Sequence, residues 1–318
     1  MADQLRAVGS RRELTVALDD EQLAVHFQPV VDLRTARIRG VEALLRWDHP
    51  EHGLLPAAAF LPAVDGTPVM LEVTRFVLTE ACRAVAAGAP PGWSLSVNIT
   101  AADAAREALL DEVAAALELA GMPAARLVLE VTETGLLSNL DDSARVLRRL
   151  TSTGVTVALD DFGSGYSSLR LLRELPISEL KVDALFVRQL DTNAGDAAIV
   201  GNVIRLADAF GASVVAEGVE HVGQAAVLRQ LGCKFGQGFL WSRPAPLAEV
   251  RALDLPAQPT DGRPPEAVRA RVRALFAGGA SPHSVAAALN GEGVRTPDGR
   301  RWHPRSVEAL RRELDGAG

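Results

Sequence analysis

The chain alternates strand-type and helix-type segments over most of its 318 residues. Short β-type runs are each followed by a longer stretch with apolar residues at helical spacing. Repeated strand–helix units favour a parallel sheet, and eight of them predict an α/β fold, a TIM-like (β/α)8 barrel. The predicted strands are residues 24–32, 37–47, 94–99, 127–132, 156–161, 179–183, 213–218 and 235–241, with the main helices at 69–87, 101–120, 138–153, 197–210 and 221–231.

The first two predicted strands are joined differently from the others. Only about five residues, 33–37, separate them, which is too few for a parallel crossover and suits a hairpin. We therefore expect an antiparallel first strand in an otherwise parallel barrel.

A Pro-rich segment ends the predicted barrel and indicates a domain boundary. Beyond it, three short helices are expected at residues 266–276, 281–289 and 304–314. The predicted units are an N-terminal lead-in at 1–21, the barrel at 22–254, the Pro-rich linker at 255–265 and a small basic, helix-turn-helix-like unit at 266–315.

Charge is distributed unevenly along the chain. Residues 262–318 contain 10 Arg and 6 Asp or Glu, whereas the preceding residues contain 23 basic and 34 acidic side chains. The body is therefore acidic and the tail basic. Lys181 and Lys234 are the only lysines among 33 basic residues, and a flexible ammonium does different chemistry from a planar guanidinium.

The two cysteines, Cys82 and Cys233, form neither a disulfide framework nor a metal-binding spacing. The sequence also shows no charged-then-apolar leader and no apolar span of about 18 residues. We therefore expect a cytoplasmic protein without a membrane segment, whose site chemistry comes from oxygen ligands.

One predicted strand ends in two adjacent carboxylates, Asp160 and Asp161, followed by a glycine-punctuated loop. Successive strand side chains face opposite sides, so both can share a target only at a turn, which Gly163 and Gly165 allow. Two carboxylates this close repel each other unless a cation lies between them, and hard divalent ions with oxygen ligands serve that purpose. From the pair alone, a helix N-cap is an equally good interpretation.

Polar side chains recur at the carboxyl ends of the predicted strands, where barrels of this class place their chemistry. One buried carboxylate is usually paired with an arginine, but five or more that converge on one lysine cannot all be neutralised that way. Metal ions are the expected solution. The set comprises Glu42, Asn98, Glu130, Glu133, Asp160, Asp161, Lys181, Glu217, Glu220 and Gln237.

The order of these motifs resembles that of the EAL-domain cyclic-di-GMP phosphodiesterases, from about residue 22 to residue 247. Any one motif is weak, but the ordered set is specific. The resemblance implies hydrolysis of one phosphodiester bond of cyclic-di-GMP to linear pGpG in bacterial signal transduction. The motifs are Glu42-Ala43-Leu44-Leu45-Arg46-Trp47, Val97-Asn98-Ile99, Glu130-Val131-Thr132-Glu133, Asp160-Asp161-Phe162-Gly163-Ser164-Gly165-Tyr166, Lys181-Val182-Asp183, Glu217-Gly218-Val219-Glu220 and Gln237-Gly238-Phe239.

The resemblance further implies a cofactor of two Mg²⁺ or Mn²⁺ ions, which would activate water and bind charge on the phosphoryl oxygens. Glu217 resembles the general base of the family, and Lys181 resembles its water-contacting cation. The implied ligands are Glu42, Asn98, Glu130 and Asp160 for one ion, and Asp160, Asp161 and Glu217 for the other, with Asp160 bridging.

Other positions resemble residues around the substrate of the family. Arg46 shares a strand face with Glu42 and resembles the arginine that contacts a substrate phosphate; a surface ion pair with Asp48 is the alternative. Glu133 resembles the residue that braces the loop at 161–168, through which family members commonly form homodimers. The remaining predicted substrate-binding or second-layer residues are Gln28, Leu45, Glu220 and Gln237.

About fifty residues of the tail are similar to the helix-turn-helix-like segment behind the catalytic domain of large serine recombinases, although no such catalytic domain precedes them. Its arginines could contact DNA phosphates, or they could form a solvated face on a small helical cap that packs on the barrel or a protein partner. The arginines in question are Arg295, Arg300, Arg301 and Arg305.

Three functions are therefore open: a phosphodiesterase, a cyclic-di-GMP receptor that does not cut its ligand, and a DNA-binding regulator with the barrel as sensor. Receptors of this fold typically lack a metal ligand or the base. All of these residues are present here, which favours the enzyme.

Overall fold

The computed structural model describes residues 10–163, 168–255, 264, 266–292, 294, 296 and 301–315. Within these ranges, no helix is both long enough and apolar enough to cross a membrane. The strands are β1 (Leu23–Asp32), β2 (Arg37–His49), β3 (Gly53–Pro56), β4 (Ser94–Asn98), β5 (Leu127–Thr132), β6 (Thr156–Phe162), β7 (Glu179–Val182), β8 (Ser213–Ala216) and β9 (Phe235–Gln237).

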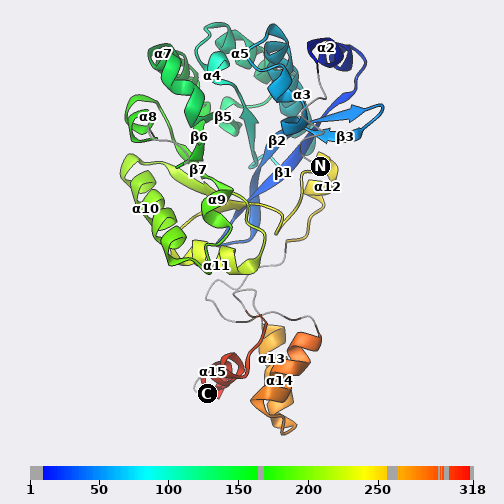
Figure 1. The fold of residues 1–318 in the computed structure, drawn as a ribbon, viewed down its shortest axis with the longest axis vertical. Coiled ribbons are helices and arrows are strands. Elements are labelled where there is room, and N and C mark those ends of the chain that lie inside the picture. Colours follow the sequence, from blue (N-terminus) through cyan, green and yellow to red (C-terminus); the bar gives the residue numbers. More distant parts are fainter. Residues whose placement is uncertain are drawn as a thin grey trace.

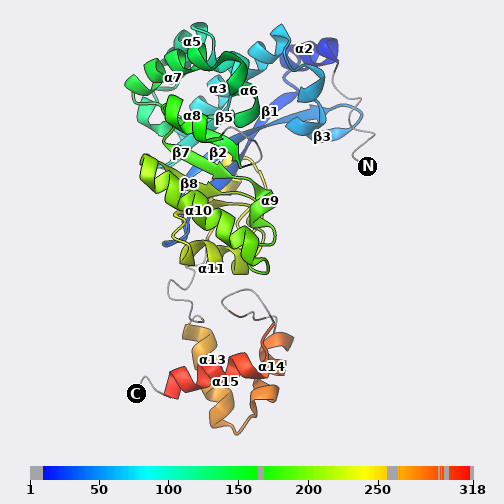
Figure 2. The same ribbon diagram turned by 60° about the vertical axis from the view of Figure 1, so that its left-hand side comes forward.

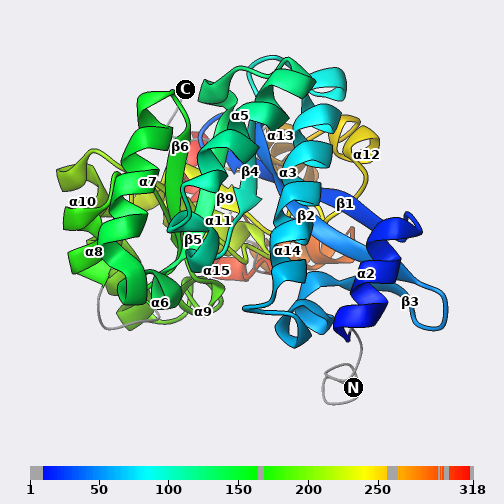
Figure 3. The same cartoon turned by 90° about the horizontal axis from the view of Figure 1, so that it is seen from above.

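The helices of the barrel region surround the strands (Figures 1 and 3). They are α2 (Arg11–Asp19), α3 (Pro68–Gly88), α4 (Ala101–Ala104), α5 (Ala108–Ala120), α6 (Glu133–Leu136), α7 (Leu140–Ser152), α8 (Ser168–Glu174), α9 (Ala184–Val187), α10 (Ala194–Phe210), α11 (Val222–Gln230) and α12 (Leu247–Arg251). Short 3-10 turns lie at Ala57–Ala59, Leu61–Ala63, Ala124–Arg126 and Leu137–Asn139.

Eight strands close into a barrel, as the sequence predicts. The sheet order is β1-β9-β8-β7-β6-β5-β4-β2-β3, and an additional pairing of β1 with β2 closes the ring. Strand β1 is antiparallel to both β2 and β9, whereas the other barrel neighbours from β2 and β4 through β9 are parallel. This confirms the antiparallel first strand. Strand β3 was not predicted; it extends β2 as a hairpin outside the ring.

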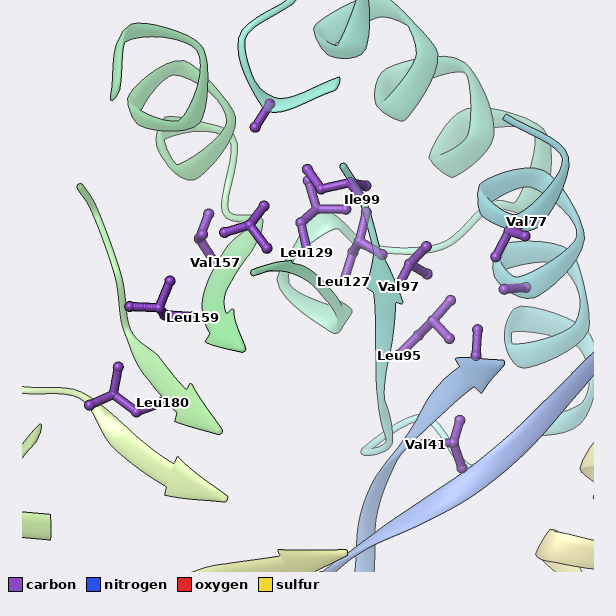
Figure 4. Packing of buried hydrophobic residues seen from close by; sticks show 14 of the residues in the cluster. Val41, Val77, Leu95, Val97, Ile99, Leu127, Leu129, Val157, Leu159 and Leu180 are labelled. Atoms are coloured by element: carbon purple, nitrogen blue, oxygen red, sulfur yellow. The ribbon is translucent and has the colours of Figure 1, made fainter. Parts of the chain in front are cut away.

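The main hydrophobic core lies between the strands and the helices. Alternate residues of the parallel strands point outward into it, which leaves the intervening residues to face the barrel interior. Figure 4 shows the outward set on neighbouring strands: Val41, Leu95, Val97, Leu127, Leu129, Val157, Leu159 and Leu180.

Helix α2 falls in the segment that the sequence assigns to a lead-in. Its first turn is stabilised by a capping box, in which Ser10 Oγ accepts from the Glu13 amide and Glu13 accepts from the Ser10 amide. Leu14 and Ala17 are fully buried in the main core. The described part of the lead-in is therefore packed onto the barrel.

Several predicted elements end earlier than expected, because local polar groups or glycines interrupt them. The helix predicted at 101–120 is two helices, α4 and α5. Strand β7 ends at Val182, since Asp183 caps α9 by accepting the Leu185 amide at 2.8 Å. Strand β9 ends before Gly238, which lies against the Val219 backbone.

The tail forms three helices, α13 (Glu266–Ala277), α14 (Pro282–Gly291) and α15 (Pro304–Asp315), close to the predicted ranges. Figure 2 shows them packed against one another. They share a hydrophobic core of their own, separate from that of the barrel, built around Val272, Val285, Leu289, Trp302 and Val307. Most of the predicted linker, together with Arg295 and Arg300, lies outside the described residues.

Candidate active site

The strand register brings the predicted polar residues to one end of the barrel. Asn98 pairs with Glu130 across β4 and β5, and Thr132 pairs with Asp160 across β5 and β6. Glu130 and Lys181 alternate with the outward-facing leucines of their strands, so both project into the interior. The barrel closure thus gathers side chains that lie far apart in the sequence.

Asp160 and Asp161 share the site because β6 is irregular at this point. The pairing of β6 with β7 shifts register between Leu159 and Phe162, and Asp161 adopts a positive φ of 55°. The Asp161 amide donates to Oδ1 of Asp160 at 3.0 Å. Carboxylate oxygens of Asp160, Asp161 and Glu217 lie within 4.8 Å of one another. The backbone bulge therefore aims two successive carboxylates at one place.

Lys181 lies at the centre of the acidic side chains. Its Nζ is 2.6 Å from Oε2 of Glu130 and 2.6 Å from Oε1 of Glu217. The same atom is 3.4 Å from Oε2 of Glu42 and 3.5 Å from Oδ1 of Asp160. One buried ammonium thus contacts four carboxylates contributed by four strands or strand ends.

This crowding shifts the pKa values of the group. Burial, together with the carboxylates of Asp160 and Glu42, raises the pKa of Glu217 to about 7, against the opposing effect of Lys181. Burial also raises the pKa of Glu130 well above its ordinary value, and it raises that of Asp161 together with the neighbouring Asp160. The site therefore favours added positive charge or bound protons.

Glu42 behaves differently because more groups stabilise its charge. Although burial opposes ionisation, the Lys181 ammonium and hydrogen bonds from Gln237 and Asn98 hold the pKa of Glu42 below its ordinary value. Gln237 Nε2 donates to Oε2 of Glu42 at 2.7 Å, and Asn98 Nδ2 donates to Oε1 at 2.7 Å. Gln28 completes this network by accepting from Gln237 at 3.2 Å.

A cavity of about 380 Å³ opens beside these residues. Leu44, Ala184 and Phe239 line it in addition to the predicted polar groups, and sequence reasoning did not assign them to the site. The Arg243 guanidinium lies 4.1 Å from the centre of the Phe239 ring. Leu44 could have been predicted, because it lies two positions after Glu42 on the same strand and so faces the same side. The contact of Arg243 with Phe239 could not, because Arg243 lies in a loop without a repeating sequence pattern.

The structure places Leu45 and Arg46 on different faces of β2. Leu45 is buried in the main core and lines a different cavity from Glu42, so Leu44 is the neighbour that faces the site. Arg46 is half-buried, and its Nη1 donates to the Leu45 carbonyl at 2.8 Å. Burial lowers the pKa of Arg46, while the charge of Glu42 acts to raise it.

Two further predicted residues lie at the edge of the cluster. Glu133 is buried at the start of α6, directly after β5, but residues 164–167 of the loop it is predicted to brace lie outside the described residues. Glu220 lines the 380 Å³ cavity, and its amide donates to Oε1 of Gln224 at 2.7 Å.

The donor set fits divalent cations. Five carboxylates face one ammonium, so this group carries a net charge of −4 when all are ionised, which two divalent ions would neutralise. Among the described residues, Oε1 of Gln237 is buried without a hydrogen-bond partner. The carboxylates are Glu42, Glu130, Asp160, Asp161 and Glu217.

The fold and the site together define an α/β-barrel protein with a cavity at the carboxyl ends of its strands, lined by carboxylates that could bind cations. The family model of the EAL domain matches residues 11–244. That range covers most of the chain, so the chain belongs to the EAL domain family.

Relatives of this chain are found in Pseudomonas aeruginosa. It is 41% identical over 243 residues to the bifunctional diguanylate cyclase/cyclic di-GMP phosphodiesterase MucR. This alignment covers 76% of this chain and 36% of MucR. It is also 41% identical over 256 residues to the cyclic di-GMP phosphodiesterase NbdA, in an alignment that covers 80% of this chain and 33% of NbdA. The chain thus spans about a third of the length of these curated relatives.

Among solved structures, the PaMucR phosphodiesterase in a c-di-GMP complex is similar, with a TM-score of 0.71 and 40% sequence identity. The match covers 76% of this chain and 98% of that one. The similarity of the tail to serine recombinases concerns residues outside the family match and stays a prediction.

Proposed function

We propose that this chain hydrolyses one phosphodiester bond of cyclic-di-GMP to linear pGpG and so lowers the level of this second messenger. The observation that carries the proposal is the meeting of Glu42, Glu130, Asp160 and Glu217 around Lys181. The similarity to a phosphodiesterase solved with c-di-GMP, at 40% identity over nearly all of that chain, supports the choice of substrate.

The acidic residues would hold two Mg²⁺ or Mn²⁺ ions, assigned as the sequence predicts. Bound there, such ions lower the pKa of water and stabilise charge that develops on phosphoryl oxygens. The carboxylates of Asp160, Asp161 and Glu217 supply one ligand group, and Asn98 joins Glu42, Glu130 and Asp160 in the other.

Glu217 is proposed as the general base. In the metal-free protein, burial and the neighbouring carboxylates raise the pKa of Glu217, which makes it a better proton acceptor than an exposed carboxylate. Lys181 holds Oε1 of Glu217 at 2.6 Å and thereby orients it toward the cavity. Lys181 also contributes a fixed positive charge beside the position proposed for the attacked phosphate.

Substrate contacts are proposed for residues around the cavity. Gln28 and Gln237 line it and are hydrogen-bonded to each other, so each orients the other. Glu220 lines the same cavity, whereas Arg46 shares a strand face with Glu42 and offers a guanidinium for a phosphate. Leu45 is proposed to act through packing, since its side chain belongs to the core.

The test is an assay of nucleotide products. With Mg²⁺ or Mn²⁺, the unmodified protein should convert cyclic-di-GMP to pGpG, and Glu42→Ala and Glu217→Ala should abolish turnover. Glu72→Ala, at an exposed position on α3, is the matched control and should keep full activity. Unchanged turnover in both site variants would remove the assignment of these residues. Ligand binding without any product would favour the receptor function instead.

For the tail we propose DNA binding that couples to the barrel, with a protein partner as the alternative. The three helices bury a core of their own, which supports an independent unit. Arg301, just before α15, and Arg305, in its first turn, are both exposed and can meet phosphates. The acidic Glu308 and Glu313 on the same helix limit the strength of this attraction.

This second proposal has its own measurement. Retention of duplex DNA should fall steeply as salt rises, because each phosphate contact releases a counterion. Removing residues 262–318 should abolish the retention, and Arg301→Ala with Arg305→Ala should weaken it. Retention that survives the truncation would show that the tail is not responsible.

A further inference from the structure

A cavity of about 480 Å³ lies at the end of the barrel opposite the acidic site. It is bordered by the end of β1, the end of α11 and the start of β9, and these points mark the amino-terminal end of the parallel strands. Its volume falls in the range of small-molecule sites. The residues that matter here are Asp32, Arg34, Arg229, Cys233, Lys234 and Phe235.

The lining of this cavity is strongly basic. Arg34, Arg229 and Lys234 contribute three cations, and among the described residues that line it Asp32 is the only acid. Burial opposes ionisation of Asp32, but hydrogen bonds from Thr35 and from the Arg34 amide hold its pKa below the ordinary value. Asp32 therefore stays ionised at neutral pH, and the cavity carries a net charge of +2.

The backbone fixes two of these cations beside each other. The Leu33 amide donates to the Lys234 carbonyl at 2.9 Å, and Asp32 pairs with Phe235 in the sheet. Arg34 and Lys234 thus flank the last rung of the β1–β9 ladder, and both side chains are exposed. Arg229 approaches from the last turn of α11 and is half-buried, with its pKa lowered by burial.

General stabilisation does not account for this arrangement. A cation in the last turn of a helix is favourable, which explains Arg229 alone. Arg34 and Lys234 lie in a turn and a connecting segment, outside any helix, so a helix end does not explain their positions. The residues before the tail carry 34 acidic against 23 basic side chains, so a cluster of three cations runs against the charge of the barrel.

We propose that this cavity, the basal cavity, binds a small phosphate-bearing anion at a site separate from the catalytic one. The exposed Arg34 guanidinium can donate paired hydrogen bonds to phosphate oxygens, the Lys234 ammonium adds a point charge, and Arg229 adds a further positive charge to the lining. The buried Cys233 and Phe235 add less polar surface to the lining, and the Arg39 guanidinium lies 4.4 Å from the centre of the Phe235 ring.

Calorimetry of the full chain in EDTA tests the basal cavity, because the metal-free acidic site repels anions. Pyrophosphate should bind, and the double change Arg34→Ala with Lys234→Ala should weaken its affinity about tenfold or more. Arg12→Ala, an exposed position on α2, is the control and should bind as the unmodified protein does. Unchanged affinity in the double variant, or an equal signal from NaCl at matched ionic strength, would overturn the proposal.

A second measurement needs no variant. Lys234 is exposed whereas Lys181 is buried, so an amine-reactive reagent read by mass spectrometry reports on Lys234. Pyrophosphate should protect Lys234 from modification several-fold, and identical labelling with and without it would contradict the site. Comparing inorganic phosphate with guanosine monophosphate distinguishes a bare phosphate ligand from a nucleotide, since the nucleotide binds more tightly only if the less polar surface of the lining contributes.

Discussion

The ammonium of Lys181 lies 2.6 Å from Oε2 of Glu130, and the two side chains are only 2% and 1% exposed. Such a pair is stable as a unit, but removing one partner leaves an uncompensated charge in the interior. The carboxylates around Lys181 outweigh burial and raise its pKa well above the ordinary value, so it is charged at any physiological pH.

Replacing this lysine should therefore destabilise the metal-free protein. Lys181→Met should lower the free energy of unfolding by about 3–5 kcal/mol in urea titrations with EDTA, because the surrounding carboxylates lose their cation. Lys234→Met changes the other lysine of the chain, which is exposed, and should shift the value by less than about 0.5 kcal/mol. Equal effects of the two changes would contradict the central role of Lys181.

Divalent ions should stabilise the protein even without substrate. Added Mg²⁺ or Mn²⁺ neutralises carboxylates that now depend on one ammonium, and an ion at 100 times its Kd contributes about 2.7 kcal/mol. Thermal unfolding should shift upward with ion concentration and return after chelation.

Asp160→Asn should reduce this shift, since both proposed ion positions share Asp160, and Asp142→Asn on α7 serves as the exposed control. An ion-independent melting temperature in the unmodified protein would argue against metal binding at these carboxylates.

The sequence predicts the barrel well because its periodicity is local. Successive side chains of a strand face opposite sides, so the inward position of Glu130 and the outward position of Leu129 follow from counting by two. The short link between the first strands, residues 33–36, likewise determines their antiparallel pairing. Once the barrel closes, the polar residues at the carboxyl ends of its strands meet in one site, so their proximity follows from the predicted fold.

Features that depend on contacts between distant segments were not predictable. The bulge that turns Asp161 toward Asp160 appears as a register shift against β7, which no local pattern encodes. Arg34 and Lys234 of the basal cavity come together through the β1–β9 pairing, which the sequence pattern around either residue does not encode.

Both cysteines should be unreactive in the folded protein. Burial raises the pKa of Cys82 to about 11 and that of Cys233 to about 12, so at pH 8 less than about one thiol in 1,000 is a thiolate. A thiol reagent should modify neither cysteine in buffer and both in concentrated urea. Rapid labelling of the native protein would show that the barrel opens around one of these positions.

Gly238 should tolerate no side chain, because the backbone of Val219 lies against it. A Cβ at this position would lie 2.1 Å from the Val219 carbonyl oxygen, which accepts the Leu240 amide at 2.9 Å and so cannot move away freely. The Val219 amide in turn donates to the Gln237 carbonyl at 3.0 Å, so a displacement here reaches the site.

Gly238→Ala should therefore lower the free energy of unfolding by about 1–3 kcal/mol and also reduce turnover, since Gln237 holds Glu42 at 2.7 Å. Gly92→Ala is the matched change, because a Cβ there meets nothing within 4 Å. Urea unfolding and the product assay on both variants provide the comparison. If Gly238→Ala matched Gly92→Ala in both measurements, the close backbone packing beside Gln237 would not be a constraint on this site.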